Sequence, residues 1–423
     1  MRSLGALLLI GALVACSSKG DGGKGISRAD FTGSWRIVFD SPGGALPIAL
    51  EIFSKGAPGP NGAPAVYRNG AHEQAFSEVV VDGRRINLRV EHRDAALTAT
   101  LSADGKTLVG TWQVVTHDGD SALPIVGYKG ATERFVEDDF QPPGAGDAVA
   151  SVDGAWEITF GSDGKLVGVA EFKQEGEQVS GSIIHPAGSY RYLAGRYKNG
   201  VLLLSMFNGG EVALVRARAQ KDGSLKGGAW VNDEHYTSFK GQPTDSMAAA
   251  TTLRDPYSQV KVISPNGRIE FEFSDTEGKK LSMEAPRFES KVVLVELFGT
   301  WCSNCNDAAP HLVDWYQKYH KEGLEIVGLA YEHTGDAARD LRQVQRFKEH
   351  YKIPFPLLLA GTSDLSRPLE SISEISMYPT TLFIGRDGKV QKIHTGFLGP
   401  SSGEHYKRQV AQLEADIKEL LQQ

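Results

Sequence analysis

Cysteine is scarce in this sequence, which has three among its 423 residues: Cys16, Cys302 and Cys305. So few cysteines exclude a fold held together by several structural disulfides. They also disfavour a structural zinc site, because Cys302 and Cys305 would need a second pair of ligands and no histidine lies within their motif. The two cysteines are therefore either an inert disulfide or a redox couple, and we predict no metal site.

An excess of positive charge is also missing. The formal net charge is −7 and no strongly basic segment stands out, which argues against a nucleic-acid partner. A long apolar run is missing as well, since the run from Leu4 to Val14 is too short to span a bilayer comfortably. The remaining composition, 41% hydrophobic and 23% charged, is ordinary for a folded protein of several domains.

The apolar run ends in Leu13-Val-Ala-Cys16, which resembles the lipobox of bacterial lipoproteins. The resemblance implies cleavage before Cys16 and lipid on that cysteine, with more than one acyl chain to give stable anchoring. Ser17, where lipoproteins of the inner membrane would carry Asp, implies the outer membrane. We therefore expect a location in the cell envelope, facing the periplasm. The alternative is an ordinary secretory signal that ends by chance in a cysteine.

Two related units precede the cysteine pair. The segments around Trp35 and Trp156 match, as do those around Trp112 and Trp230, at similar offsets and in the same order. Short runs of alternating polarity are separated by Asp-Gly and Asn-Gly pairs, which favour two-residue hairpins. We predict two antiparallel β units, each a small barrel or sandwich, loosely similar to lipocalin-like domains. The four tryptophans are expected in the cores, and a ligand in a barrel mouth is the alternative.

After these units the pattern changes to strands that alternate with helices, which predicts an α/β sheet. The predicted organisation is therefore multidomain, with a duplicated all-β N-terminal region followed by an α/β domain. The boundaries are a signal peptide at 1–15, a lipidated flexible tether at 16–28, β units at 29–135 and 150–242, a linker at 243–262 and the α/β domain at 263–423.

The motif 301–305, Trp-Cys-Ser-Asn-Cys, lies where the apolar strand 291–298 gives way to a helix. The free N–H groups and the dipole of a helix N-terminus stabilise a thiolate, which is the form that attacks disulfides. Cys302 is thus the expected nucleophile, and Cys305, one turn later, is the resolving thiol. A disulfide pair that is kept alone in an oxidising compartment is more plausibly chemical than structural.

Four segments resemble the TlpA/ResA-type, membrane-associated members of the thioredoxin family: 291–305, Pro310, 323–330 and 378–390. The resemblance covers about residues 263–423 and implies a thioredoxin-like fold. It further implies a cis peptide bond at Tyr378–Pro379 that faces the disulfide, with Tyr378, Pro379 and Thr380 binding the substrate chain. Trp301 would shield the reactive sulfur; the alternative is a packing aromatic.

Glu296 interrupts the otherwise apolar strand, where an unpaired carboxylate is costly. It lies six residues before Cys302, as the buried aspartate of thioredoxins does, so we expect it to shuttle the proton of Cys305. A paired or edge-exposed glutamate is the alternative. Relatives often carry a glutamate three residues after the second cysteine, but here that position is Ala308, and Asp307 is one residue short.

The leading prediction is a lipid-anchored thiol–disulfide oxidoreductase outside the cytoplasm that reduces protein disulfides. No cofactor is expected besides the Cys302–Cys305 disulfide, and the electrons would come from a membrane thiol donor. Three alternatives remain: an oxidation- or peroxide-directed relative, a binding or scaffold lipoprotein whose β units capture a partner, and, more weakly, a copper chaperone.

Overall fold

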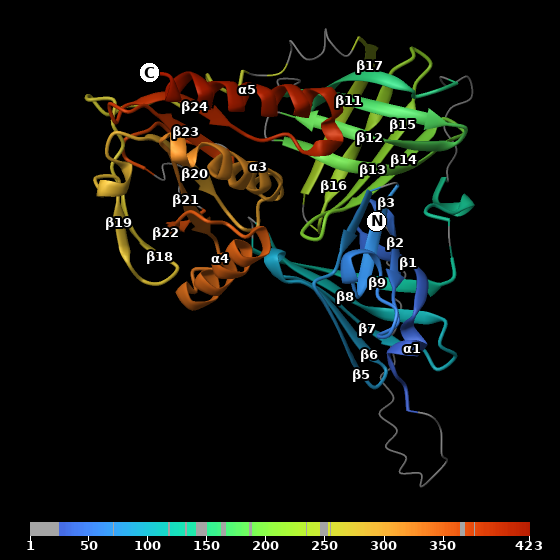
Figure 1. The fold of residues 1–423 in the computed structure, drawn as a ribbon. Coiled ribbons are helices and arrows are strands. Elements are labelled where there is room, and N and C mark those ends of the chain that lie inside the picture. The colour runs from blue at the N-terminus through green and yellow to red at the C-terminus, as the bar shows by residue number, and fades with distance from the viewer. Residues whose placement is uncertain are drawn as a thin grey trace, which may run out of the picture.

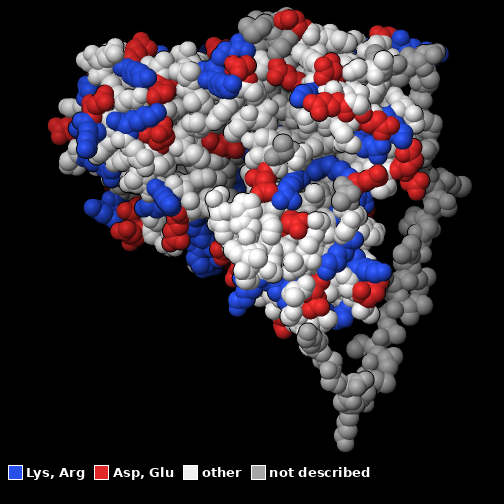
Figure 2. Space-filling view, turned by 45° about the vertical axis from the view of Figure 1, so that its right-hand side comes forward, with Lys and Arg blue, Asp and Glu red and all other residues white. Residues whose placement is uncertain are grey.

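The computed structural model describes residues 25–70, 72–116, 119–131, 133–140, 150–161, 166–185, 188–233, 235–245, 253, 255–363, 369–375 and 377–423 (Figure 1). The predicted signal peptide, Cys16 and most of the tether lie outside these residues. No helix in the described part of the chain is both long and apolar enough to span a bilayer. On the face in Figure 2, acidic and basic side chains are interspersed rather than gathered by sign.

The first repeat forms one antiparallel sheet in the order β4-β3-β2-β1-β9-β8-β7-β6-β5. Strands that follow one another in the sequence are neighbours in the sheet, except β4 and β5, which form its two edges. The first strand, β1, also pairs with the last, β9, in the middle of the sheet, and the edges do not pair with each other. Short helices α1 (Arg28–Phe31), η1 (Pro60–Gly62), η2 (Glu91–Arg93) and η3 (Glu137–Phe140) accompany it. The strands are β1 (Gly33–Ser41), β2 (Gly44–Ile52), β3 (Ala65–Asn69), β4 (His72–Ala75), β5 (Glu78–Asp82), β6 (Arg85–Val90), β7 (Ala95–Leu101), β8 (Thr107–Thr116) and β9 (Gly119–Lys129).

The second repeat closes into an up-and-down barrel, in which β10 pairs with β17. The Asn199-Gly200 turn shows why the sequence favours this meander: both residues have positive φ, as a two-residue hairpin requires. The strands are β10 (Gly154–Phe160), β11 (Leu166–Glu175), β12 (Gln178–His185), β13 (Gly188–Lys198), β14 (Val201–Phe207), β15 (Val212–Ala219), β16 (Leu225–Val231) and β17 (His235–Thr244).

The all-β character of the N-terminal region is confirmed, but the prediction of a barrel or sandwich for each repeat is correct only for the second. The first sheet stays open because the outer face of the barrel fills its apolar side. Side chains of β14 and β15 join the core of the first sheet, and Phe207 contacts the rings of Phe39, Tyr67, Phe76 and Trp112. The two repeats therefore share one hydrophobic core.

The tryptophans of the repeats support the duplication. The indole N–H of Trp35 donates to the carbonyl of Phe31 at 2.7 Å, and that of Trp156 donates to Val152 at 2.9 Å, four residues earlier in both cases. Trp35, Trp112 and Trp156 are buried, whereas Trp230 is partly buried against the core of the first sheet. The barrel interior is packed with side chains such as Trp156 and Phe239, which favours the core interpretation over a ligand in the barrel.

The C-terminal domain is a seven-stranded sheet in the order β19-β18-β22-β21-β20-β23-β24, with three central parallel strands as in thioredoxin-like folds. Buried side chains of helices α3, α4 and α5 cover one face, and segments around 260–288 and 369–375 cover the other. The elements are β18 (Glu272–Asp275), β19 (Lys280–Ser282), η4 (Pro286–Phe288), β20 (Val292–Phe298), α3 (Ser303–Tyr319), η5 (His320–Glu322), β21 (Leu324–Glu332), α4 (Ala337–Tyr351), β22 (Leu357–Thr362), β23 (Thr380–Ile384), β24 (Val390–Thr395), η6 (Pro400–Ser402) and α5 (Gly403–Leu421).

The N-terminal ends of α3, α4 and α5 face the β region (Figure 1). In α4, Arg339 pairs with Asp94 at 2.9 Å, just after η2. In α5, His405 lies 3.2 Å from Glu171 of β11. This arrangement places the start of α3, where the two cysteines lie, against the barrel.

Candidate redox site

The cysteine pair lies at the junction between β20 and α3. Cys302 is the N-cap of α3, and the backbone N–H of Cys305 points at its sulfur, 3.2 Å away. The two residues form a disulfide with a Cα–Cα distance of 5.3 Å. Cys302 is 7% exposed and Cys305 is 3% exposed, so both residues are buried and Cys302 is the more accessible of the two. The helix N-terminus expected from the sequence is present, with the donor that would hold a thiolate on Cys302.

The residues predicted to bind substrate lie around Cys302. The Tyr378–Pro379 peptide bond is cis, as predicted, and the carbonyl oxygen of Tyr378 lies 3.5 Å from the Cys302 sulfur. The Trp301 ring contacts that of Tyr378, with centroids 5.5 Å apart, and its indole N–H donates to the carbonyl of Tyr331. Thr380 is buried at the start of β23. The structure thus brings Trp301, Tyr378 and Pro379 together on one side of the disulfide.

Glu296 is buried at 3% exposure, on the face of β20 that α3 covers. Its carboxylate accepts a hydrogen bond of 2.5 Å from the hydroxyl of Thr381. Burial raises the pKa of Glu296 to about 7, and the hydrogen bond from Thr381 opposes this only in part. A carboxyl group with that pKa can accept or release a proton near neutral pH, which is the property that its predicted role requires.

A second buried carboxyl, Glu332 at the end of β21, was not predicted. It accepts hydrogen bonds from the backbone N–H and the hydroxyl of Thr300, both at 2.8 Å. Burial raises its pKa to about 7, against the opposing effect of these bonds. Glu332 fixes the turn that leads from β20 to Cys302. The signal available in the sequence was its place at the end of an apolar strand.

The dipeptide between the cysteines is covered by the β region, which no sequence pattern indicated. Arg93 of η2 donates to the hydroxyl of Ser303, and that hydroxyl donates to Glu211 in the β14–β15 hairpin. The side-chain amide of Asn208 also donates to the Ser303 hydroxyl, at 3.0 Å. Arg191 of β13 is bonded to the same dipeptide. As a result Ser303 is only 6% exposed.

Arg191 makes three contacts with the start of α3. It donates to the backbone carbonyl of Ser303 at 2.9 Å and to the side-chain oxygen of Asn304 at 2.5 Å. It also forms an ion pair of 2.6 Å with Asp307. Burial raises the pKa of Asp307 despite this partner. Burial works to raise the pKa of Glu211 too, but Arg93, Ser303 and Arg191 outweigh it and leave that pKa below its usual value.

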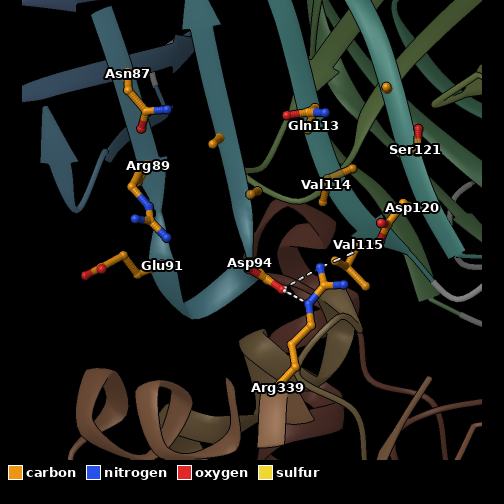
Figure 3. Close-up of a pocket in the computed structure, with 13 residues that line it drawn as sticks. Asn87, Arg89, Glu91, Asp94, Gln113, Val114, Val115, Asp120, Ser121 and Arg339 are labelled. Atoms are coloured by element: carbon orange, nitrogen blue, oxygen red, sulfur yellow. Dashed lines mark hydrogen bonds and ion pairs between the residues drawn. The ribbon is translucent and has the colours of Figure 1, made fainter. Parts of the chain in front are cut away.

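A groove opens beside the site, with a volume of about 360 Å³ (Figure 3). It lies between the first sheet and α4, and the Arg339–Asp94 pair lies at its edge. A much smaller cavity shares Asp94, Val115 and Arg339 with this groove and reaches Trp301. Among the described residues, no group of three or more His, Cys, Asp or Glu side chains is arranged to hold a metal ion.

The C-terminal part of the chain is similar to known thiol–disulfide oxidoreductases. Residues 267–393 match the AhpC/TSA family. The chain is 30% identical over 136 residues to the thiol-disulfide oxidoreductase ResA of Bacillus subtilis (strain 168), covering 69% of that protein and 32% of this chain. It is also 30% identical over 138 residues to the ResA of Halalkalibacterium halodurans, covering 72% of that protein and 33% of this chain.

Among solved structures, the crystal structure of a thiol:disulfide interchange protein of the thioredoxin family from Chlorobium tepidum TLS is similar. Its sequence is 22% identical, the TM-score is 0.29, and the alignment covers 99% of that protein and 38% of this chain. A thiol-disulfide oxidoreductase from Bacteroides fragilis is 18% identical, with a TM-score of 0.27 and coverage of 99% of that protein and 35% of this chain.

Proposed function

Since this chain belongs to the ResA-like thiol–disulfide oxidoreductases of the thioredoxin family, we propose that it reduces disulfides of other proteins in the cell envelope. The observation that carries the proposal is the Cys302–Cys305 disulfide at a helix N-terminus, facing the Tyr378–Pro379 segment. Such a site has a nucleophile, a resolving thiol and a backbone edge for an extended substrate chain on one side.

The proposed reaction starts from the dithiol form. The Cys302 thiolate attacks one sulfur of the substrate disulfide, which breaks that bond, forms a mixed disulfide and releases one substrate thiolate. Cys305 then attacks the Cys302 sulfur, releases the second substrate thiolate and closes the Cys302–Cys305 disulfide. Two electrons have passed from the pair to the substrate. Trp301, Tyr378 and Pro379 hold the substrate chain during the first attack, and the buried Thr380 anchors this segment in β23.

Glu296 takes the proton of Cys305 before resolution and then gives it to the substrate thiolate that leaves. Its burial beneath α3 and its raised pKa support this role. A group with a pKa near the working pH can perform both steps, whereas an ordinary glutamate with a pKa of about 4.3 would be a poor acceptor.

The direction of the reaction and the electron donor are both part of this proposal. ResA relatives are named oxidoreductases without a stated direction, so reduction is our choice on resemblance. Each turnover leaves the pair oxidised, so a membrane-bound dithiol must supply two electrons to regenerate it. Lipid on Cys16, which lies outside the described residues, would keep the chain next to such a donor and would explain a location at the outer membrane.

The test is insulin reduction by the full chain with a dithiol donor. Cys302→Ser should abolish turnover, and Cys305→Ser should accumulate a mixed disulfide with the substrate that a chemical reductant releases. The wild-type pair should equilibrate with glutathione at a potential near that of thioredoxin, about −270 mV. A potential near −120 mV, or turnover that survives Cys302→Ser, would contradict the proposal.

A second candidate is a scaffold lipoprotein whose β region captures one partner and restricts the redox chemistry to it. The contacts of Arg93, Arg191 and Glu211 with the cysteine motif favour it, because they leave the substrate only the Trp301 side. The groove between the first sheet and α4, which shares lining residues with the small cavity at Trp301, offers a place for such a partner chain. The two candidates differ in whether the isolated C-terminal domain discriminates among disulfides as the full chain does.

A further inference from the structure

Of the β-region residues that bond the Ser303–Asn304 dipeptide, three are charged and buried: Arg93, Arg191 and Glu211. Arg93 is 3% exposed, the side chain of Arg191 is 4% exposed, and Glu211 is enclosed by both arginines and by Ser303. Burying such charges is costly unless they are paired and hydrogen-bonded. Their position on the residues between the two cysteines therefore calls for a functional explanation.

We propose that Arg93, Arg191 and Glu211 are positioning residues of the redox centre, through which the β region sets how readily Cys302 is held as a thiolate. The inference rests on the proposed function in one respect, namely that this thiolate is the attacking group. It adds a contribution from the β region, which the similarity to ResA does not cover.

The first step of the argument is proximity. Ser303 follows Cys302 directly, and both guanidinium groups donate to atoms of Ser303. Buried charges at this range act on the thiolate with little screening by water or salt. They add to the effect of the α3 N-terminus, whose free N–H groups already favour negative charge on Cys302.

The second step is balance. Two cations, Arg93 and Arg191, face two acidic groups, Glu211 and Asp307, so the cluster is close to neutral when all four are ionised. Removing one member unbalances it with a known sign. Loss of a guanidinium disfavours the thiolate, whereas loss of the Glu211 charge favours it, because the arginines then lack their counter-ion.

The third step is that the other titratable groups facing this cluster are neutral near pH 7, so they do not disturb that balance. Burial raises the pKa values of the surrounding tyrosines and lowers those of the surrounding histidines. The groups are Tyr67, Tyr190, Tyr192, Tyr351, His72, His92 and His185. Two further buried carboxyls near the motif, Glu296 and Glu332, are unchanged in the variants below.

The experiment uses the full chain with Cys16→Ser and Cys305→Ser, so that Cys302 is its single thiol. The rate of alkylation by iodoacetamide, measured against pH, reports the thiolate fraction. Below the midpoint, Arg191→Met should lower that fraction at least threefold and Glu211→Gln should raise it at least threefold. The matched control is Arg339→Ala, which removes an ion pair from the same interface without touching the motif; it should leave the profile unchanged.

A second readout uses the same variants with both motif cysteines present. The equilibrium constant with glutathione should shift toward the disulfide in Arg191→Met and toward the dithiol in Glu211→Gln, because a stabilised thiolate stabilises the reduced form. A tenfold shift corresponds to about 30 mV. Glu211→Gln is nearly isosteric, so the sign of its effect decides the matter even if Arg191→Met does not fold.

The inference would be wrong if Arg191→Met and Glu211→Gln shifted the thiolate fraction in the same direction, or if Arg339→Ala shifted it as much as they do. The contacts would then only dock the β region. The outcome is separable from the proposed function. If the two variants shift the thiolate fraction in opposite directions but the protein does not reduce insulin, the proposed substrate is refuted and the inference stands. If the protein reduces insulin but neither variant shifts the thiolate fraction, the inference is refuted and the proposed function stands.

Discussion

At the residue scale, Glu296 and Glu332 are two buried carboxyls with the same raised pKa and different neighbours. Glu296 lies beneath α3, and Glu332 holds the Thr300 turn. Glu296→Gln should slow resolution of the mixed disulfide about tenfold or more, since a positioned acid–base group contributes about 10²–10⁴. The first attack should stay largely intact. Stopped-flow quenching of the mixed disulfide measures both steps, and unchanged turnover with unchanged Cys305 reactivity would remove Glu296 from the mechanism.

The control for this substitution is Glu332→Gln, because both substitutions should change the stability of the fold in the same way. Their pKa values of about 7 lie above that of an unfolded glutamate, so the folded state keeps protons that the unfolded state has released. The free energy of unfolding should therefore fall as pH rises from about 5 to 7 and stay lower above that. At pH 8, the free energy of unfolding of either variant, measured by urea titration, should be roughly 1–3 kcal/mol higher than that of the wild type. Only Glu296→Gln should slow resolution of the mixed disulfide.

Sequence reasoning found the residues whose neighbours are local or are marked by a motif. Cys302 and Cys305 follow a strand, Pro379 lies in a recognisable segment, and Glu296 breaks an apolar run. Arg191 gave no such signal, because an arginine between two tyrosines in an alternating strand is typical of a solvent-facing position. Its partners Ser303 and Asp307 lie more than a hundred residues away, and nothing in a single sequence predicts a contact over that separation.

At the element scale, β14 explains why the first repeat is an open sheet. Its residues are buried on both faces: Leu202, Leu204 and Met206 point into the barrel, while Leu203 and Phe207 join the core of the first sheet. A continuous apolar run among alternating strands is the pattern of a strand covered on both sides. The run Val201–Phe207 has that pattern, so the sequence did contain the signal for a shared core.

Phe207 is the residue through which this shared core can be tested. It is fully buried and contacts four aromatic rings of the first sheet. Phe207→Ala should lower the free energy of unfolding by about 3–5 kcal/mol, as deletion of a buried aromatic side chain does. Val80→Ala, at a position on β5 that is 47% exposed, should cost less than about 0.5 kcal/mol. A small effect of Phe207→Ala in urea titrations would mean that the two repeats pack independently.

At the scale of the whole molecule, the β region and the C-terminal domain meet through complementary charge. Glu211, Asp94 and Glu171 each lie at the N-terminal end of a helix, α3, α4 and α5 respectively. Carboxylates are favourable at helix N-termini, so the three contacts fix the orientation of the domain against the barrel. That orientation covers the Ser303 side of the motif, whereas Trp301 stays partly exposed on the side proposed for substrate.

Because of this coverage, we expect the full chain to select among disulfides more strictly than the C-terminal domain alone. Residues 255–423 alone would expose Ser303 and Asn304, so the isolated domain should reduce insulin and a small aromatic disulfide with similar relative ease. The full chain should retain the small disulfide and lose at least threefold in its relative rate on insulin, because a polypeptide needs more room at Cys302 than a small molecule does. Circular dichroism of the isolated domain first establishes that it is folded. Equal rate ratios for the two proteins would show that the β region leaves access unchanged, and the general reductase would then be preferred over the dedicated one.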